Sequence, residues 1–328
     1  DVVVKTVRVF LALILAACLL AGCGGNQNSA GQEADNSSDA QTESEAAESS
    51  EETAEAGQPQ PIELENFTCG TIYEEGEYYF HIDSMEMTDE SYVITYRAAT
   101  DEQNYSGYYD MRLTINGIMF HEDDFAFSGA GMEGYTMIGG GPDRPITVSI
   151  PKLLLSHVGI EEVTSVKFEV GLGYSAQGSV YEEVMIEATV YPGAKTEAAD
   201  AFPEPKDDAW VLLDNEYGKV QITDANYWVS AADGHIMGIT FHLLAKGEGS
   251  GNVGLRSIAA GSWESDDSMG DYGCSLPPYT RYFRITLMGG DDPAEGTDFS
   301  QSVLSYYCDA GGLEELSTTL DLSGLSNE

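Results

Sequence analysis

Hydrophobic and polar positions alternate through most of residues 62–192, in short runs rich in β-branched and aromatic side chains. A period of two places every second side chain on the same face, which is typical of half-buried β-strands. Gly, Asn and Asp separate the runs, and Asn116-Gly117 favours a tight hairpin turn. The pattern predicts a two-sheet β-sandwich of about seven strands. These strands cover 78–82, 92–97, 111–115, 118–120, 146–150, 166–170 and 184–190.

One stretch of this half breaks the alternation. Residues 151–159 read PKLLLSHVG, with Pro151 at the first position and Gly159 just past the last apolar residue. Pro at the start and Gly after the end are the expected asymmetry of a helix. The sequence therefore predicts a short helical turn between two strands.

The β-pattern then restarts after a break. Residues 193–208 are Ala-rich, contain Pro203 and Pro205, and show no periodicity, which predicts a linker. Strand-like runs return in 209–328 at roughly 140 residues from their counterparts, which favours a divergent tandem repeat. Two unrelated β-domains would also share so coarse a pattern. The predicted strands of this half are 210–213, 217–222, 235–244 and 282–287.

The chain before residue 62 has a different character. Residues 24–58 contain no Val, Ile, Leu, Met or aromatic residue, and their charged residues are all acidic. Such a segment cannot bury enough apolar surface to offset its ordering entropy. Residues 23–61 are therefore predicted to form a disordered acidic linker.

A secretory signal is predicted at the start, over residues 1–22. Lys5 and Arg8 precede an apolar run over 10–20, which is shorter than the roughly 20 residues that span a membrane. The run ends in Leu20-Ala21-Gly22-Cys23, which resembles the lipobox of bacterial lipoproteins. The resemblance implies cleavage between Gly22 and Cys23 and a diacylglyceryl group on Cys23. It implies a protein anchored by lipid on the extracytoplasmic face of the cell membrane; the alternative is an ordinary secretory signal with an incidental cysteine.

A second resemblance concerns the folded part. It is carried by Asp214-Asn215-Glu216-Tyr217, the Leu-Thr-Ile-Asn-Gly run at 113–117 and the helix-to-strand step at 159–168. These stretches resemble repeat domains of exported lipoproteins of Firmicutes such as clostridia. The resemblance implies two immunoglobulin-like β-sandwich domains, over 62–192 and 209–328. Most such domains have no known function, so the resemblance bears on fold more than on activity.

Charge and cysteine content narrow the classes of partner. The formal net charge is −42, which disfavours nucleic acid and anionic headgroups, because both need a basic surface. With Cys23 lipidated, Cys69, Cys274 and Cys308 remain in the exported chain. Cys274 and Cys308 could form a disulfide, or both could be free thiols. No Cys-x-x-Cys is present, which gives no support to a zinc ribbon or a redox site.

Catalytic and metal-binding motifs are not evident. The sequence has no H-E-x-x-H and no G-x-S-x-G. His235 and His242 are seven residues apart on one predicted strand, which puts them on opposite faces. We therefore predict no metal site, no cofactor and no enzyme activity. Acidic clusters at 122–124, 264–271 and 291–298 lack EF-hand spacing, and calcium binding by loops stays open.

Tyrosines supply the one candidate for ligand contact. Tyr105, Tyr108 and Tyr109 cluster in the first domain, and amphipathic rings suit sugar or protein surfaces. Cross-strand packing is the simpler explanation for such rings. The sequence thus predicts a lipid-anchored extracytoplasmic binding or structural protein. The alternative is a cell-surface glycan-binding or enzyme-associated module that uses exposed tyrosines.

Overall fold

The computed structural model describes residues 59–328, apart from 77, 100–105, 122–123, 130–136, 139–144, 177–178, 197–201, 231, 233, 266–271, 290–292, 295 and 327–328. The described residues belong to one compact unit. They are mainly β-strand, arranged in several sheets, which confirms the predicted mainly-β class. The predicted signal at 1–22, Cys23 and nearly all of the linker at 23–61 lie outside the described residues.

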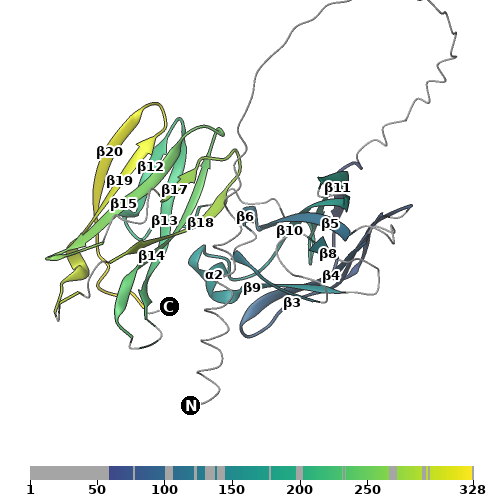
Figure 1. Cartoon of the computed structure of the whole chain (residues 1–328), viewed down its shortest axis with the longest axis horizontal. Helices are drawn as coiled ribbons and strands as arrows, with labels where there is room; N and C mark the ends of the chain where they lie inside the picture. Colours follow the sequence, from purple (N-terminus) through teal and green to yellow (C-terminus); the bar gives the residue numbers. More distant parts are fainter. Residues whose placement is uncertain are drawn as a thin grey trace, which may run out of the picture. The chain divides into compact units, whose positions relative to one another are not determined.

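The first half contains two facing sheets (Figure 1). One sheet has the order β2-β3-β4-β9-β7, and the other runs β1-β11-β10-β5-β6, with β8 beside β5. Every strand predicted here is present. The elements are β1 Ile62–Leu64, β2 Gly70–Glu75, β3 Tyr78–Met87, β4 Ser91–Ala99, β5 Ser106–Ile115, β6 Ile118–Phe120, β7 Ala126–Gly129, β8 Met137–Ile138, β9 Ile146–Pro151, α2 Lys152–His157, β10 Val166–Ala176 and β11 Ser179–Val190.

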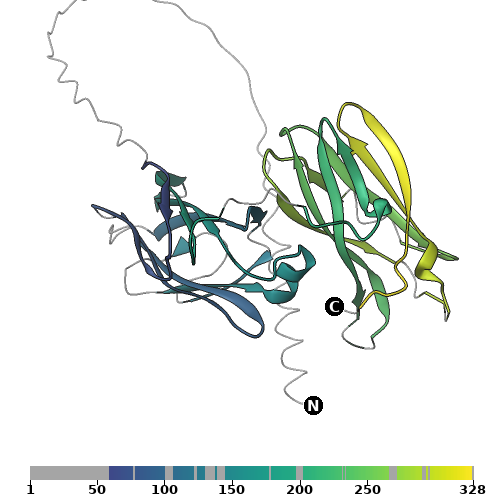
Figure 2. The same ribbon diagram turned by 180° about the vertical axis from the view of Figure 1, so that it is seen from behind.

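The second half repeats this arrangement (Figure 2). Its sheets run β12-β13-β14-β18 and β16-β15-β19-β20, with β17 beside β15. These orders match β2-β3-β4-β9 and β6-β5-β10-β11 of the first half strand for strand. The elements are the 3-10 helix η2 Asp208–Trp210, β12 Val211–Asn215, β13 Gly218–Val229, β14 Ile236–Gly247, β15 Asn252–Ala260, β16 Trp263–Glu264, β17 Tyr272–Ser275, β18 Arg281–Met288, the 3-10 helix η4 Phe299–Gln301, β19 Ser302–Asp309 and β20 Leu313–Leu320.

Each half encloses its own hydrophobic core. One cluster gathers apolar side chains from both sheets of the first half, and a second cluster extends from Trp210 to Leu322. Leu244 and Tyr282 of the second half belong to the first cluster. Strands β6 and β18 pair in parallel at Met119 and Arg281, where the Met119 N–H donates to the Thr280 carbonyl at 2.9 Å. The two cores are therefore joined by a shared sheet and by apolar contacts.

The predicted helical turn and hairpin are both confirmed. Helix α2 follows Pro151, and Gly159 has a φ of +76°, the left-handed conformation typical of a residue after a helix. Asn116 and Gly117 join β5 to β6 with φ values of +49° and +83°, as a two-residue hairpin turn requires. Local sequence therefore determines these two features.

Replacing Asn116 by Ala should lower the free energy of unfolding by about 4 kcal/mol. The Asn116 Nδ2 donates to the Glu162 carbonyl at 2.7 Å, and its Oδ1 accepts from the Thr164 and Ser165 N–H groups at 2.8 and 3.1 Å. Each lost bond costs about 1 kcal/mol, and a positive φ strains Ala by about another 1 kcal/mol. Urea unfolding should rank Asn116→Gly, which avoids the strain, as milder than Asn116→Ala; equal losses would contradict the strain contribution.

Candidate functional site

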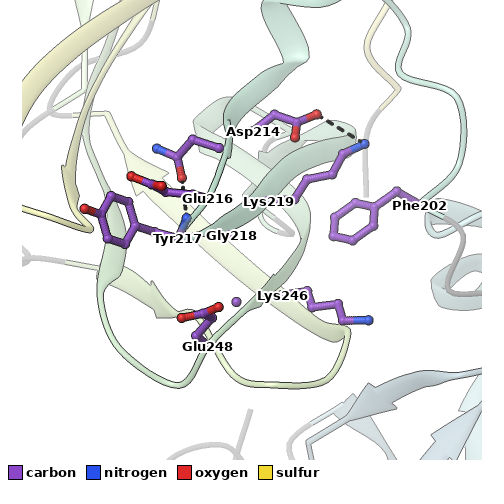
Figure 3. A pocket seen from close by; sticks show the side chains of 10 residues that line it. Phe202, Asp214, Glu216, Tyr217, Gly218, Lys219, Lys246 and Glu248 are labelled. Carbon is purple, nitrogen blue, oxygen red and sulfur yellow. Dashed lines mark hydrogen bonds and ion pairs between the residues drawn. The ribbon is translucent and has the colours of Figure 1, made fainter.

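An open pocket of about 590 Å³ lies at the turn between β12 and β13 (Figure 3). It is built from this hairpin, the end of β14 and one residue of the preceding connection. The hairpin is the Asp-Asn-Glu-Tyr stretch that the sequence singled out. The lining residues are Phe202, Asp214, Asn215, Glu216, Tyr217, Gly218, Lys219, Lys246, Gly247 and Glu248.

Local chemistry explains why the sequence forms this hairpin. Asn215 pairs with Gly218, and the Asn215 Oδ1 accepts from the Tyr217 N–H at 2.9 Å, which closes an Asx turn. A Cβ on Gly218 would lie 2.4 Å from the Lys246 carbonyl oxygen, so only glycine fits there. The Tyr217 ring lies against Gly311, where a Cβ would come within 2.7 Å of it. The turn is thereby fixed and the tyrosine is held in place.

Two lysines on neighbouring strands line the pocket. Lys219 and Lys246 are directly opposed in the β13–β14 ladder, and like charges at such positions destabilise a sheet. The Lys219 Nζ lies 3.7 Å from the Asp214 carboxylate and 5.0 Å from the centre of the Phe202 ring, a cation–π distance. In Figure 3, the Phe202 ring lies on the side of the pocket where both lysine side chains extend. The lining thus combines two ammonium groups and three carboxylates with aromatic surface.

The lining carries charged side chains of both signs beside aromatic rings. The charged lining residues are the lysines Lys219 and Lys246 and the acids Asp214, Glu216 and Glu248. Lysine ammonium groups pair with anions, and aromatic rings pack against apolar surface. The pocket suits a polar ligand with an apolar face, whose anionic group would pair with the lysines and whose donors would bond to the carboxylates.

A second cluster of ionisable side chains lies where α2 meets β13 and β14; His157 and His242 are buried, whereas Asp224 and Lys206 are partly exposed. The rings of His157 and His242 are stacked, with centroids 3.8 Å apart and planes 17° apart. The His157 Nδ1 lies 2.7 Å from one carboxylate oxygen of Asp224, and the Lys206 Nζ donates to the other at 2.6 Å. Burial alone would raise the pKa of Asp224, but the hydrogen bonds from His157 and Lys206 outweigh it and hold that pKa well below its usual range.

His242 is held in its neutral form. Its Nδ1 lies 2.7 Å from the Tyr282 hydroxyl and its Nε2 lies 2.6 Å from the Asn226 Oδ1. A neutral ring that donates from Nε2 and accepts at Nδ1 satisfies both contacts. Only 1% of His242 is exposed, and this burial, reinforced by the charge of His157, lowers the pKa of His242 to about 3.

The contacts of the histidine cluster join α2 to β13 and β14. The His157 Nε2 is buried and has no hydrogen-bond partner among the described residues, so solvent and substrates do not reach it. No group of three or more His, Cys, Asp or Glu in the described part of the chain could hold a metal ion. Within its own predicted strand, His242 has only His235 as a histidine neighbour in the sequence. His157 lies on a helix 85 positions earlier in the chain, and no sequence spacing signals that pairing.

Ligand contact by Tyr105, Tyr108 and Tyr109 stays a prediction from the sequence. Tyr105 lies outside the described residues. Tyr108 and Tyr109 lie in β5, where their backbones pair with Gly173 and Leu172 of β10. Their side chains, like Gly22 and Cys23, lie outside what the structure describes.

The structure decides between the two alternatives for the cysteines. Cys69, Cys274 and Cys308 are free thiols. Cys274 on β17 and Cys308 on β19 both pair with Val253 and so flank strand β15 on opposite sides. Neighbouring strands are about 4.8 Å apart, which separates these cysteines by roughly 10 Å, beyond the reach of a disulfide. Of the two alternatives left open by the sequence, the structure has the free thiols.

Reducing agents should leave the melting temperature unchanged. Burial raises the pKa of Cys274 to about 12, so this thiol should resist alkylation in the folded protein, whereas exposed Cys69 should react. Mass spectrometry after alkylation under denaturing, non-reducing conditions should find Cys69, Cys274 and Cys308 all modified. A mass lower by two hydrogens with two cysteines unmodified would show the bridge instead.

No helix in the described ranges is long and apolar enough to cross a membrane. Neither a protein-family model nor a curated protein matches the sequence.

Proposed function

We propose that this protein is a lipid-anchored binding protein of the extracytoplasmic membrane face, without catalytic activity. The lipobox-like Leu20-Ala21-Gly22-Cys23 supports the anchor, and the acidic residues that follow support a spacer. The open pocket at the β12–β13 turn is the observation that carries the binding role. Its ligand is an anionic component of the cell surface.

The shared strand order of the two halves supports tandem immunoglobulin-like domains. Strands β3-β4-β9-β7 follow the A-B-E-D order of that fold, and β11-β10-β5-β6 follow G-F-C-C′. In the second half, β13-β14-β18 and β20-β19-β15-β16 take the same places. Domains of this kind commonly present binding loops on a rigid scaffold.

The anchor is tested by Cys23→Ser. Two acyl chains on one residue give stable attachment, whereas the variant has no sulfur to acylate. We expect the wild-type protein in the membrane fraction, and the variant either released into the medium or retained with its signal uncleaved. Unchanged fractionation of a cleaved variant would contradict lipidation.

The pocket is tested by co-sedimentation of the exported chain with purified insoluble cell wall. The double variant Lys219→Gln/Lys246→Gln should lose most of the bound fraction, because both ammonium groups are removed. Lys195→Gln is the matched control, since Lys195 is an exposed lysine paired with Glu63 away from the pocket lining. Equal binding by all three proteins would rule out this pocket as the contact. Tyr108→Ala tests the alternative tyrosine surface in the same assay.

A further inference from the structure

The outer face of the second half's β13-β14-β18 sheet carries polar side chains in register. Ile239, Phe241 and Leu243 of β14 belong to the second core, so Thr240 and His242 lie on the opposite face. Across the three strands, Asn226, Thr240 and Thr286 form one row. Trp228 pairs with Gly238 in the row on one side, and His242 pairs with Arg284 in the row on the other.

Part of this face is covered and part is hollowed. Leu244 and Tyr282 pack into the first core, and His242 stacks on His157. The adjoining part forms a hollow of about 380 Å³, lined by Trp228, Val229, Thr240, Arg284 and Thr286. None of these residues lines the pocket at the β12–β13 turn.

The hollow brings together three complementary groups. Trp228 is half-buried, which keeps part of its ring accessible. Thr240 and Thr286 place their hydroxyl oxygens 3.0 Å apart on the floor. Arg284 is exposed, and it makes no ion pair or hydrogen bond with any described residue, in a chain of net charge −42. No carboxylate in the described part of the chain pairs with this guanidinium, so among those residues nothing competes with a ligand for it.

We propose that this hollow binds a uronic acid, a sugar ring that carries a carboxylate. The planar guanidinium of Arg284 matches a carboxylate with two parallel hydrogen bonds. The Trp228 ring offers an amphipathic surface to the apolar C–H face of the sugar, and the threonine hydroxyls bond to its hydroxyl groups. Small-ligand sites are typically about 300–1,000 Å³, so this hollow suits one or two rings. The surrounding negative charge disfavours polyanions such as nucleic acids, which leaves a singly charged ring as the best match.

Tryptophan fluorescence tests the site directly. Trp210 and Trp263 are only 2% and 4% exposed, so Trp228 is the tryptophan that a ligand in the hollow would affect. The chain from residue 24 onward, titrated with sodium glucuronate, should show a saturable emission change. Glucose, at the same ionic strength, should bind at least tenfold more weakly because it has no carboxylate.

Variants locate the effect at this hollow. Arg284→Gln should abolish glucuronate binding, and Arg284→Lys should weaken it about tenfold, because an ammonium lacks the two-pronged geometry. Lys219→Gln, in the other pocket, should leave glucuronate binding unchanged; a loss in this variant instead would place the contact in that pocket and overturn the proposal.

Calorimetry with Trp228→Phe, whose ring is smaller, should show weakened binding. Equal responses to glucose and glucuronate, or wild-type affinity in Arg284→Gln, would overturn the proposal. These results do not depend on the anchor or on cell-wall binding.

Discussion

Acidification from pH 6.5 to pH 5 should lower the free energy of unfolding by about 2 kcal/mol through His242 alone. The pKa of His242 is about 3 in the folded protein and about 6.5 in an unfolded chain. Between these values the unfolded chain binds a proton that the folded protein excludes, so stability falls as the pH falls. Integrated down to pH 3, the loss reaches about 4–5 kcal/mol.

The surroundings of His242 explain why its pKa is lowered. Burial is the largest cause, and the charges of His157, Arg284 and Lys206 also disfavour protonation, while Asp224 favours it. Asp224 has a lowered pKa, so its contribution to stability is complete above about pH 5 and is lost progressively below it. The interval from pH 6.5 to 5 therefore separates the histidine from the carboxylate.

Urea unfolding at several pH values measures the effect, with His242→Gln as the control. Gln has no proton to gain in this range, and its amide can still bond to Asn226 or Tyr282. The wild type's advantage in free energy of unfolding over the variant should shrink as the pH falls from 6.5, by about 1.4 kcal/mol per pH unit. Parallel curves for the two proteins would contradict the assignment.

Asp224→Ala should lower the free energy of unfolding by about 2–3 kcal/mol at pH 7. The substitution leaves the His157 Nδ1 without its partner, in a residue whose Nε2 already has none. Removing one partner of a buried ion pair typically costs about 3–5 kcal/mol, and we expect less here because the Asp224 side chain is 31% exposed. Because Asp224 connects β13 to α2 and Lys206, we also expect the two halves to unfold in separate transitions in this variant.

A double substitution tests whether the loss comes from the pair. Replacing both groups by apolar ones, as in Asp224→Ala/His157→Phe, should recover much of the stability, because no unpaired polar group remains. Asp224→Asn should fall between wild type and Asp224→Ala, since its amide oxygen still accepts a hydrogen bond. Additive losses in the double variant would show that Asp224 acts independently of His157. Calorimetry, which counts the transitions, decides whether the halves separate.

Some strands were missed for a physical reason. Strand β20 exposes almost all of its residues, so its sequence, LEELSTTL, has no apolar face to signal it. It is held by its backbone pairing with β19. Strand β17 is short, and its placement beside β15 separates Cys274 from Cys308. Which strand pairs with β17 or β20 depends on the arrangement of the whole sheet, and the spacing of residues in the sequence does not reveal it.

The sequence by itself determined the features that depend on neighbouring residues. The alternating strands, the Asn116-Gly117 turn, the Pro151 and Gly159 limits of α2 and the mainly-β class all follow from local conformational preference and periodic burial. Only the tertiary structure decided which distant residues meet: His157 with His242, Lys219 with Lys246, and Trp228 with Arg284. These contacts depend on strand register and on the packing of the two cores, which involve the chain as a whole.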